Sequence, residues 1–74
     1  MITDFTLKKL AFEYAGYDSL LNGIHYNFTH PTKGKFTALM PDKYSRIELD
    51  SLDYTINVVF TSLKDLKDWI QDIL

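Results

Sequence analysis

Residues 24–40 read IHYNFTHPTKGKFTALM, and the alternation within this stretch decides the fold class. Ile24, Tyr26 and Phe28 are large and apolar, whereas the residues between them are polar. A period of two is typical of a β-strand that buries one face. The turn-forming residues 30–35 follow, and the alternation then resumes. We therefore predict a β-hairpin with the KGK triplet near its tip.

Two later stretches of the chain are also strand-like. Residues 46–49 (RIEL) and 54–60 (YTINVVF) are separated by the turn-forming DSLD at 50–53. Alternation along the strands predicts two faces. The face covered by helices would carry Tyr26, Phe28, Phe36, Met40, Ile47, Tyr54, Ile56, Val58 and Phe60. The opposite face would carry His25, Asn27, Thr29, Thr37, Leu39, Glu48, Thr55, Asn57 and Val59.

The N-terminal segment has the spacing of an amphipathic helix. Its apolar face would be formed by Leu7, Leu10, Ala11 and Tyr14. We predict a helix over about residues 4–15, with Thr3 or Asp4 as its N-cap and Gly16 as the left-handed residue that ends it. The apolar residues between 10 and 14 also alternate, so a strand is the alternative for that part of the segment.

The following segment, YDSLLNG at 17–23, fits neither pattern and is left unassigned. Leu20 and Leu21 are its two aliphatic residues with large side chains. They either extend the first helix after a break or fill an edge of the core. Both interpretations place the two leucines against the rest of the fold.

The closing segment has the clearest helical pattern. Its apolar stripe consists of Leu63, Leu66, Trp69, Ile70 and Ile73. Ser62 is a good N-cap, because its side chain can accept a hydrogen bond from the amide of Asp65. We predict a helix from about residue 63 to residue 73, with Trp69 in the core.

Together these elements predict an α+β fold in the order α-β-β-β-β-α. An antiparallel sheet of three to four strands, in meander order, would be flanked by an N-terminal and a C-terminal helix on one face. The 74 residues include no cysteine, so no disulfide can stabilise the fold. We therefore predict one small globular domain over residues 1–74 that relies on its apolar core or on a second subunit.

Charge and composition narrow the classes of function. The chain has 10 acidic and 8 basic residues, and its net charge of -2 disfavours direct binding to nucleic acid. The N-terminal residues contain no uninterrupted apolar run, so we expect a cytoplasmic protein without a signal peptide or a membrane span. The abundance of Lys, Phe, Tyr, Ile and Asn is compatible with a phage or mobile-element origin.

Residues suited to catalysis or metal binding are few. His25 and His30 are the only histidines, and their spacing suits no helical pair of metal ligands. The sequence has no glycine-flanked nucleophile, no glycine-rich phosphate loop and no cysteine ligands. We therefore predict a protein that is not an enzyme and that binds neither a cofactor nor a metal ion.

Acidic residues concentrate in the second half of the chain. Asp65, Asp68 and Asp72 are three and four residues apart, which places them along one flank of the predicted helix. One interpretation of this flank is a solvated surface. The functional interpretation is a docking surface for a basic partner, extended by Asp50 and Asp53 if their turn lies near the helix. Our main hypothesis is a small inhibitor or adaptor that binds a protein with a basic surface, such as a nucleic-acid enzyme.

Two alternatives use other surfaces. An exposed sheet edge or exposed apolar residues could form a homodimer that is the functional unit. The polar sheet face could instead bind a small ligand or a nucleic acid through His25, Asn27, Thr55 and Asn57. The three hypotheses thus place the binding surface on the last helix, at a sheet edge and on the sheet face.

Overall fold

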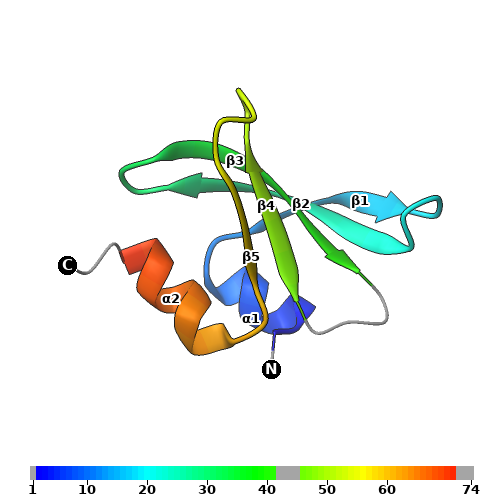
Figure 1. Cartoon of the computed structure of the whole chain (residues 1–74). Coiled ribbons are helices and arrows are strands. Elements are labelled where there is room, and N and C mark those ends of the chain that lie inside the picture. Colours follow the sequence, from blue (N-terminus) through cyan, green and yellow to red (C-terminus); the bar gives the residue numbers. More distant parts are fainter. Residues whose placement is uncertain (1, 42–45, 72–74) are drawn as a thin grey trace.

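The computed structural model describes residues 2–41 and 46–71. Its elements are α1 (Asp4–Lys9), β1 (Glu13–Asp18), β2 (Gly23–His30), β3 (Gly34–Pro41), β4 (Ile47–Ser51), β5 (Asn57–Phe60) and α2 (Leu63–Gln71). The strands form one antiparallel sheet in the order β1-β2-β3-β4-β5 (Figure 1). The predicted α+β class, the antiparallel meander and the helix at each end are confirmed, but the sheet has five strands rather than three or four.

The β2–β3 hairpin is the centre of the sheet, as the alternation predicts. Tyr26 lies opposite Ala38 and Phe28 lies opposite Phe36, and all four side chains are buried. The buried core consists of Ile2, Leu7, Phe12, Tyr26, Phe28, Phe36, Ala38, Ile47, Leu49 and Leu66. Residues of both helices belong to this cluster, so both helices pack on the same face of the sheet (Figure 1). We call this side of the sheet the inner face and the opposite side the outer face.

Helix α1 is shorter than predicted. Thr3 is its N-cap, and a capping box with Thr6 satisfies backbone groups at the start of the helix. The helix ends at Lys9, and the left-handed residue that follows it is Ala11, with a φ of 68°. The predictions of a helix as far as residue 15 and of Gly16 as its C-terminal stop are therefore wrong.

The strand alternative for residues 10–14 is confirmed only for Glu13 and Tyr14, because β1 begins at Glu13. Phe12 turns into the core and stacks on Phe28, with the ring centroids 4.2 Å apart. Burial of such a ring contributes about 1.5–3 kcal/mol, several times the helix propensity of any single residue in the segment. The β1–β2 register shifts between Tyr14 and Gly16, and the φ of 125° at Gly16 is one that residues with a side chain rarely adopt. Gly16 therefore serves a β-bulge rather than a helix end.

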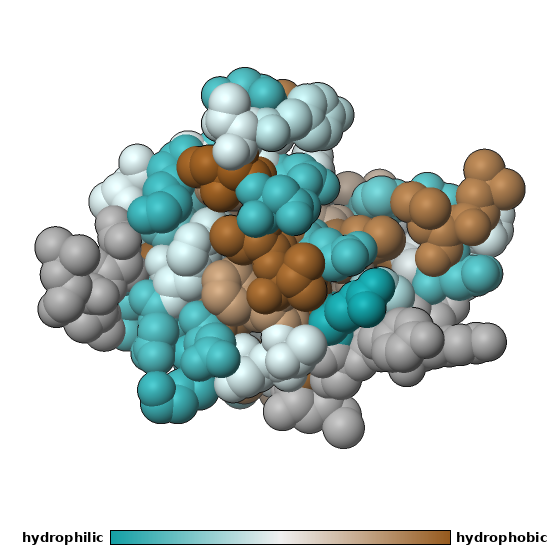
Figure 2. Space-filling model, viewed as in Figure 1, coloured by the Kyte–Doolittle hydropathy of each residue, from teal (hydrophilic) through white to brown (hydrophobic). Residues whose placement is uncertain are grey.

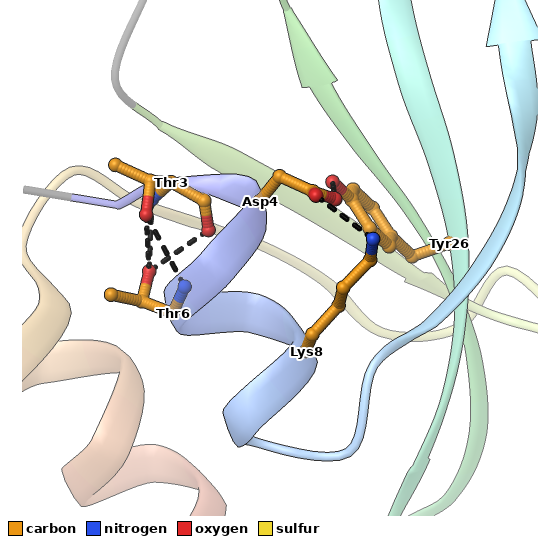
Figure 3. A network of polar contacts seen from close by, with 5 residues as sticks. All are labelled: Thr3, Asp4, Thr6, Lys8 and Tyr26. Atoms are coloured by element: carbon orange, nitrogen blue, oxygen red, sulfur yellow. Dashed lines mark hydrogen bonds and ion pairs between the residues drawn. The ribbon is translucent and has the colours of Figure 1, made fainter.

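A polar network fixes α1 to the sheet (Figure 3). The hydroxyl of the buried Tyr26 donates to Asp4 Oδ1 at 2.6 Å, and Lys8 Nζ contacts Asp4 Oδ2 at 3.1 Å. These hydrogen bonds, the one from Tyr26 above all, hold the pKa of Asp4 below its usual range. Burial and the hydrogen bond to Asp4 raise the pKa of Tyr26. The network therefore joins an ionised Asp4 on α1 to a protonated Tyr26 on β2.

Helix α2 begins as predicted and packs on the sheet through Trp69. The amide of Asp65 donates to Ser62 Oγ at 3.4 Å, and Leu66 is completely buried. Four rings of the sheet surround the indole, those of Phe28, His30, Phe36 and Phe60. Trp69 is partly buried and packs against the core, in agreement with the prediction that it belongs to the core side of the helix. The predicted end of the helix falls on residues 72–74, outside the described residues.

His30 joins α2 to the β2–β3 hairpin and is buried, although the sequence places it in a turn beside Pro31. Its Nε2 lies 2.7 Å from the Trp69 carbonyl oxygen, which can only accept a hydrogen bond, so Nε2 carries a proton. Nδ1 accepts from the amides of Thr32 and Lys33, each at 3.1 Å. Because one nitrogen donates and the other accepts, the ring is a neutral imidazole with both nitrogens in use. His30 is therefore a structural residue.

The strand predicted over residues 54–60 begins only at Asn57. Tyr54 has a φ of 60° and is exposed in the β4–β5 turn, so its predicted place under the helices is wrong. Thr55 lies in the same turn, so its predicted place on the outer face is also wrong. Both errors have one cause, because hydrogen bonds centred on the Asp53 carboxylate close the turn.

Candidate functional site

The predicted acidic flank of α2 is described only in part. Asp65 and Asp68 are exposed on the helix, and Asp72 lies outside the described residues. Lys64 Nζ contacts Asp68 Oδ2 at 3.0 Å, and this hydrogen bond raises the pKa of Lys64. Lys67 adds a second positive charge. The described part of α2 therefore carries as many basic as acidic side chains.

Asp50 and Asp53 do not extend this flank. Asp50 lies on the outer face, where its Oδ1 accepts from Asn57 Nδ2 at 2.6 Å, whereas α2 packs on the inner face. The sheet therefore separates Asp50 from the helix. Asp53 lies in the β4–β5 turn, at the opposite end of β5 from the start of α2 (Figure 1). The described aspartates of the predicted set thus do not form one surface.

Asp53 has a local structural role instead. Its Oδ1 accepts from the Thr55 hydroxyl at 2.7 Å, from the Ser51 hydroxyl at 2.7 Å and from the Thr55 amide at 3.1 Å. These hydrogen bonds, with that of the Thr55 side chain the largest cause, lower the pKa of Asp53 from 3.8 to about 2. A carboxylate whose pKa is lower in the folded state stabilises the fold above its unfolded pKa, and this contribution is lost as the pH falls through the folded pKa.

We therefore expect the protein to lose stability as the pH falls from about 4 to about 2, and the Asp53→Asn variant to lose less over the same interval. Urea denaturation at a series of pH values measures both losses. Because the pKa values of Asp4 and Asp18 are also lowered, part of the acid sensitivity should remain in the variant. An identical loss in the variant and the wild type would contradict the role given to Asp53.

The residues of the predicted polar ligand site are spread over the sheet. His25 and Asn27 lie on the outer face of β2, Asn57 lies on the outer face of β5, and Thr55 lies in a turn. Adjacent strands are about 4.8 Å apart, so Asn27 and Asn57 are separated by about 14 Å. A shallow hollow of about 430 Å³ does occur on this face, and its side chains include Glu13, Asn27, Thr29, Lys35 and Leu52. Only Asn27 of the predicted set lines it.

The β1–β2 hairpin ends in a turn that Asp18 holds in place. Its Oδ1 accepts from the amides of Leu20 and Leu21, at 2.9 and 3.1 Å. Its Oδ2 accepts from His25 Nε2 at 3.1 Å. The hydrogen bond from His25 is the main reason that the pKa of Asp18 is below its usual range. The left-handed Asn22, with a φ of 51°, completes a turn that is ordered by side chains of the hairpin itself.

The same turn exposes apolar side chains. Leu20 is 92% exposed and Leu21 is 55% exposed, and Tyr17 on the adjoining strand is 51% exposed. Figure 1 shows this hairpin projecting beyond the two helices, and Figure 2 shows hydrophobic residues at its free end. Neither alternative for the two leucines, an extension of the first helix or a place at an edge of the core, is found in the structure. We call Leu20 and Leu21 the tip leucines.

The hairpin that carries the tip leucines has few charged residues of its own. Residues 11–32 contain Glu13 and Asp18 but neither Lys nor Arg. The signal that could have identified this site is the Asn22-Gly23 pair, a dipeptide typical of β-hairpin turns. Its position directly before a predicted strand indicates a second hairpin upstream of the first.

Metal clusters and membrane-spanning helices are not found among the described residues. Within residues 2–41 and 46–71, no group of three or more acidic or histidine side chains could hold a metal ion. The helices in this described part of the chain are too short or too polar to cross a membrane. Comparisons with protein-family models, with curated proteins and with solved structures gave no match to this chain.

Proposed function

We propose that the protein is a non-enzymatic protein-interaction module, an inhibitor or adaptor, that binds its partner through the tip leucines. The observation that carries this proposal is the exposure of both side chains on a turn that Asp18 and His25 already order. Side chains at this level of exposure add little to the core, and an ordered turn reduces the entropy lost on binding. The proposal keeps the function class that the sequence predicts and assigns recognition to the β1–β2 hairpin instead of α2.

The chemistry of the tip favours an apolar pocket on another protein. Burying one leucine contributes about 1.5–3 kcal/mol, so the pair could anchor a complex. A membrane surface fits less well, because peripheral membrane elements combine apolar residues with Lys and Arg, and residues 11–32 contain neither. Glu13 and Asp18 favour a partner whose pocket has a neutral or weakly basic rim. We place this module in the cytoplasm, in line with its composition.

The test is affinity capture from a lysate of the native host, followed by binding measurements on the captured partner. We expect a Leu20→Ser/Leu21→Ser double variant to bind at least about 100-fold more weakly, because two buried leucines together contribute about 3–6 kcal/mol. The Leu52→Ser variant is the matched control. Leu52 is 60% exposed but lies in the β4–β5 turn, so its replacement should leave the affinity unchanged.

A second variant separates this proposal from docking through α2. Replacing Asp65, Asp68 and Asp72 with asparagine removes the predicted acidic flank and leaves the tip leucines intact. If the asparagine variant loses the partner, binding weakens with salt and the leucine variant still binds, the surface is the helix flank and the role of the tip is refuted. If only the leucine variant loses the partner, the tip is the recognition surface.

A further inference from the structure

Strand β5 is an open edge of the sheet with an unusual composition. It is the last strand of the sheet, and it lies nearest the viewer in Figure 1. The chain from Tyr54 to Leu63 contains no charged residue, and Val59 is 49% exposed. Figure 2 shows hydrophobic residues over β5 with hydrophilic residues on either side. An uncharged edge rich in β-branched residues is suited to pairing with another strand.

Within residues 2–41 and 46–71, the β5 backbone groups that have no strand partner belong to Asn57 and Val59. The amide of Ser51 donates to the carbonyl of Ile56 at 2.9 Å, so the backbone of Ile56 faces β4. Backbone groups alternate in direction along an antiparallel strand, so Val58 also faces β4. Asn57 and Val59 therefore point their N–H and C=O groups away from the sheet. Each copy of β5 thus offers two donors and two acceptors at this edge.

The opposite edge of the sheet is less suited to pairing. Strand β1 contains the bulge between Tyr14 and Gly16, and bulges protect edge strands because they interrupt a regular ladder. Strand β5 pairs with β4 in continuous register from Asn57 to Phe60. The β1 edge is therefore irregular, whereas the β5 edge is regular and can accept a further strand.

We propose that β5 pairs in antiparallel orientation with β5 of a second copy of this chain, which gives one continuous sheet across a two-fold axis at Val58. In this register Asn57 lies opposite Val59 of the second copy, and the free groups of both strands form the inter-subunit ladder. A second copy fits this edge because, in this register, the outward N–H and C=O groups of Asn57 meet those of Val59 of the second copy. The uncharged segment avoids the like-charge repulsion that Lys or Glu would create there.

The test measures the self-association of the full chain by sedimentation equilibrium over a wide concentration range. We expect a concentration-dependent dimer in the wild type and in the Val59→Thr variant, which keeps an uncharged β-branched side chain. The Val59→Lys variant should dissociate more than about tenfold more readily, because it places two like charges at the interface. Val59 is half exposed and lies opposite Glu48, so the lysine variant should still fold.

Hydrogen exchange on the wild type tests the register without any substitution. The amide of Val59 should become more protected as the concentration rises, whereas the amide of Val58 should be protected at every concentration because it bonds to β4. A protein that stays monomeric at about 0.5 mM overturns the proposal. So does a dimer that Val59→Lys does not weaken, or one that leaves the Val59 amide unprotected. The tip leucines take no part in this interface, so their replacement leaves the dimer intact.

Discussion

The His30→Ala variant is expected to lose about 3–5 kcal/mol of unfolding free energy. The variant removes a buried ring whose centroid lies 4.5 Å from that of Trp69, and it removes the hydrogen bond that His30 donates to the Trp69 carbonyl. Deleting a large buried side chain typically costs about 2–5 kcal/mol, and an unsatisfied buried acceptor costs about 1–3 kcal/mol. A domain of this length has a total stability of about 4–11 kcal/mol, so the variant should be marginally folded or unfolded.

Urea denaturation followed by fluorescence measures this loss directly, because the chain contains a single tryptophan and that tryptophan contacts His30. The matched control is His25→Ala. His25 is partly exposed on the outer face, and its partner among the described residues is the surface residue Asp18, so we expect a loss below about 1 kcal/mol. His30→Gln keeps a side-chain donor and should recover part of the loss. Equal losses for the two histidines would contradict the structural role of His30.

The sequence predicts the fold correctly where the apolar residues of the local pattern are also the residues that the structure buries. The alternation from residue 24 to residue 40 predicts the central hairpin, and Ser62 with its apolar stripe predicts the start of α2. The prediction fails between residues 10 and 18, where helical and alternating patterns coincide. The outcome there depends on the stacking of Phe12 on Phe28, a contact between residues far apart in the chain.

The residues of the predicted sites do not all come together in the fold, for a related physical reason. The sequence pattern groups the acidic residues by number and spacing, but Asp53 is bonded within its own turn and Asp50 lies on the side of the sheet away from α2. The sequence does not indicate the tip leucines as a binding site, because leucines in a short chain are expected to be buried. Their exposure follows from the turn closed by Asp18, which a pattern of hydrophobic periodicity does not detect.

The Leu66→Ala and Leu20→Ala variants delete the same atoms, and we expect opposite results from them. Leu66 is completely buried between α2 and the sheet, so its truncation should leave a cavity and cost about 2–5 kcal/mol of unfolding free energy. Leu20 is 92% exposed, so its truncation should change stability by less than about 0.5 kcal/mol.

If the proposed function is right, Leu20→Ala should weaken partner binding more than Leu66→Ala does. The folded fraction of Leu66→Ala should bind the partner as the wild type does, whereas Leu20→Ala should bind at least about tenfold more weakly. Urea denaturation gives the unfolding free energy of each variant, and a binding isotherm on the same preparation gives its affinity for the partner. A stability loss in Leu20→Ala comparable with that of Leu66→Ala would mean that the tip packs against the fold in solution. In that case a contribution to folding would account for the leucine at position 20. The proposal that Leu20 binds a partner would then lose its physical basis.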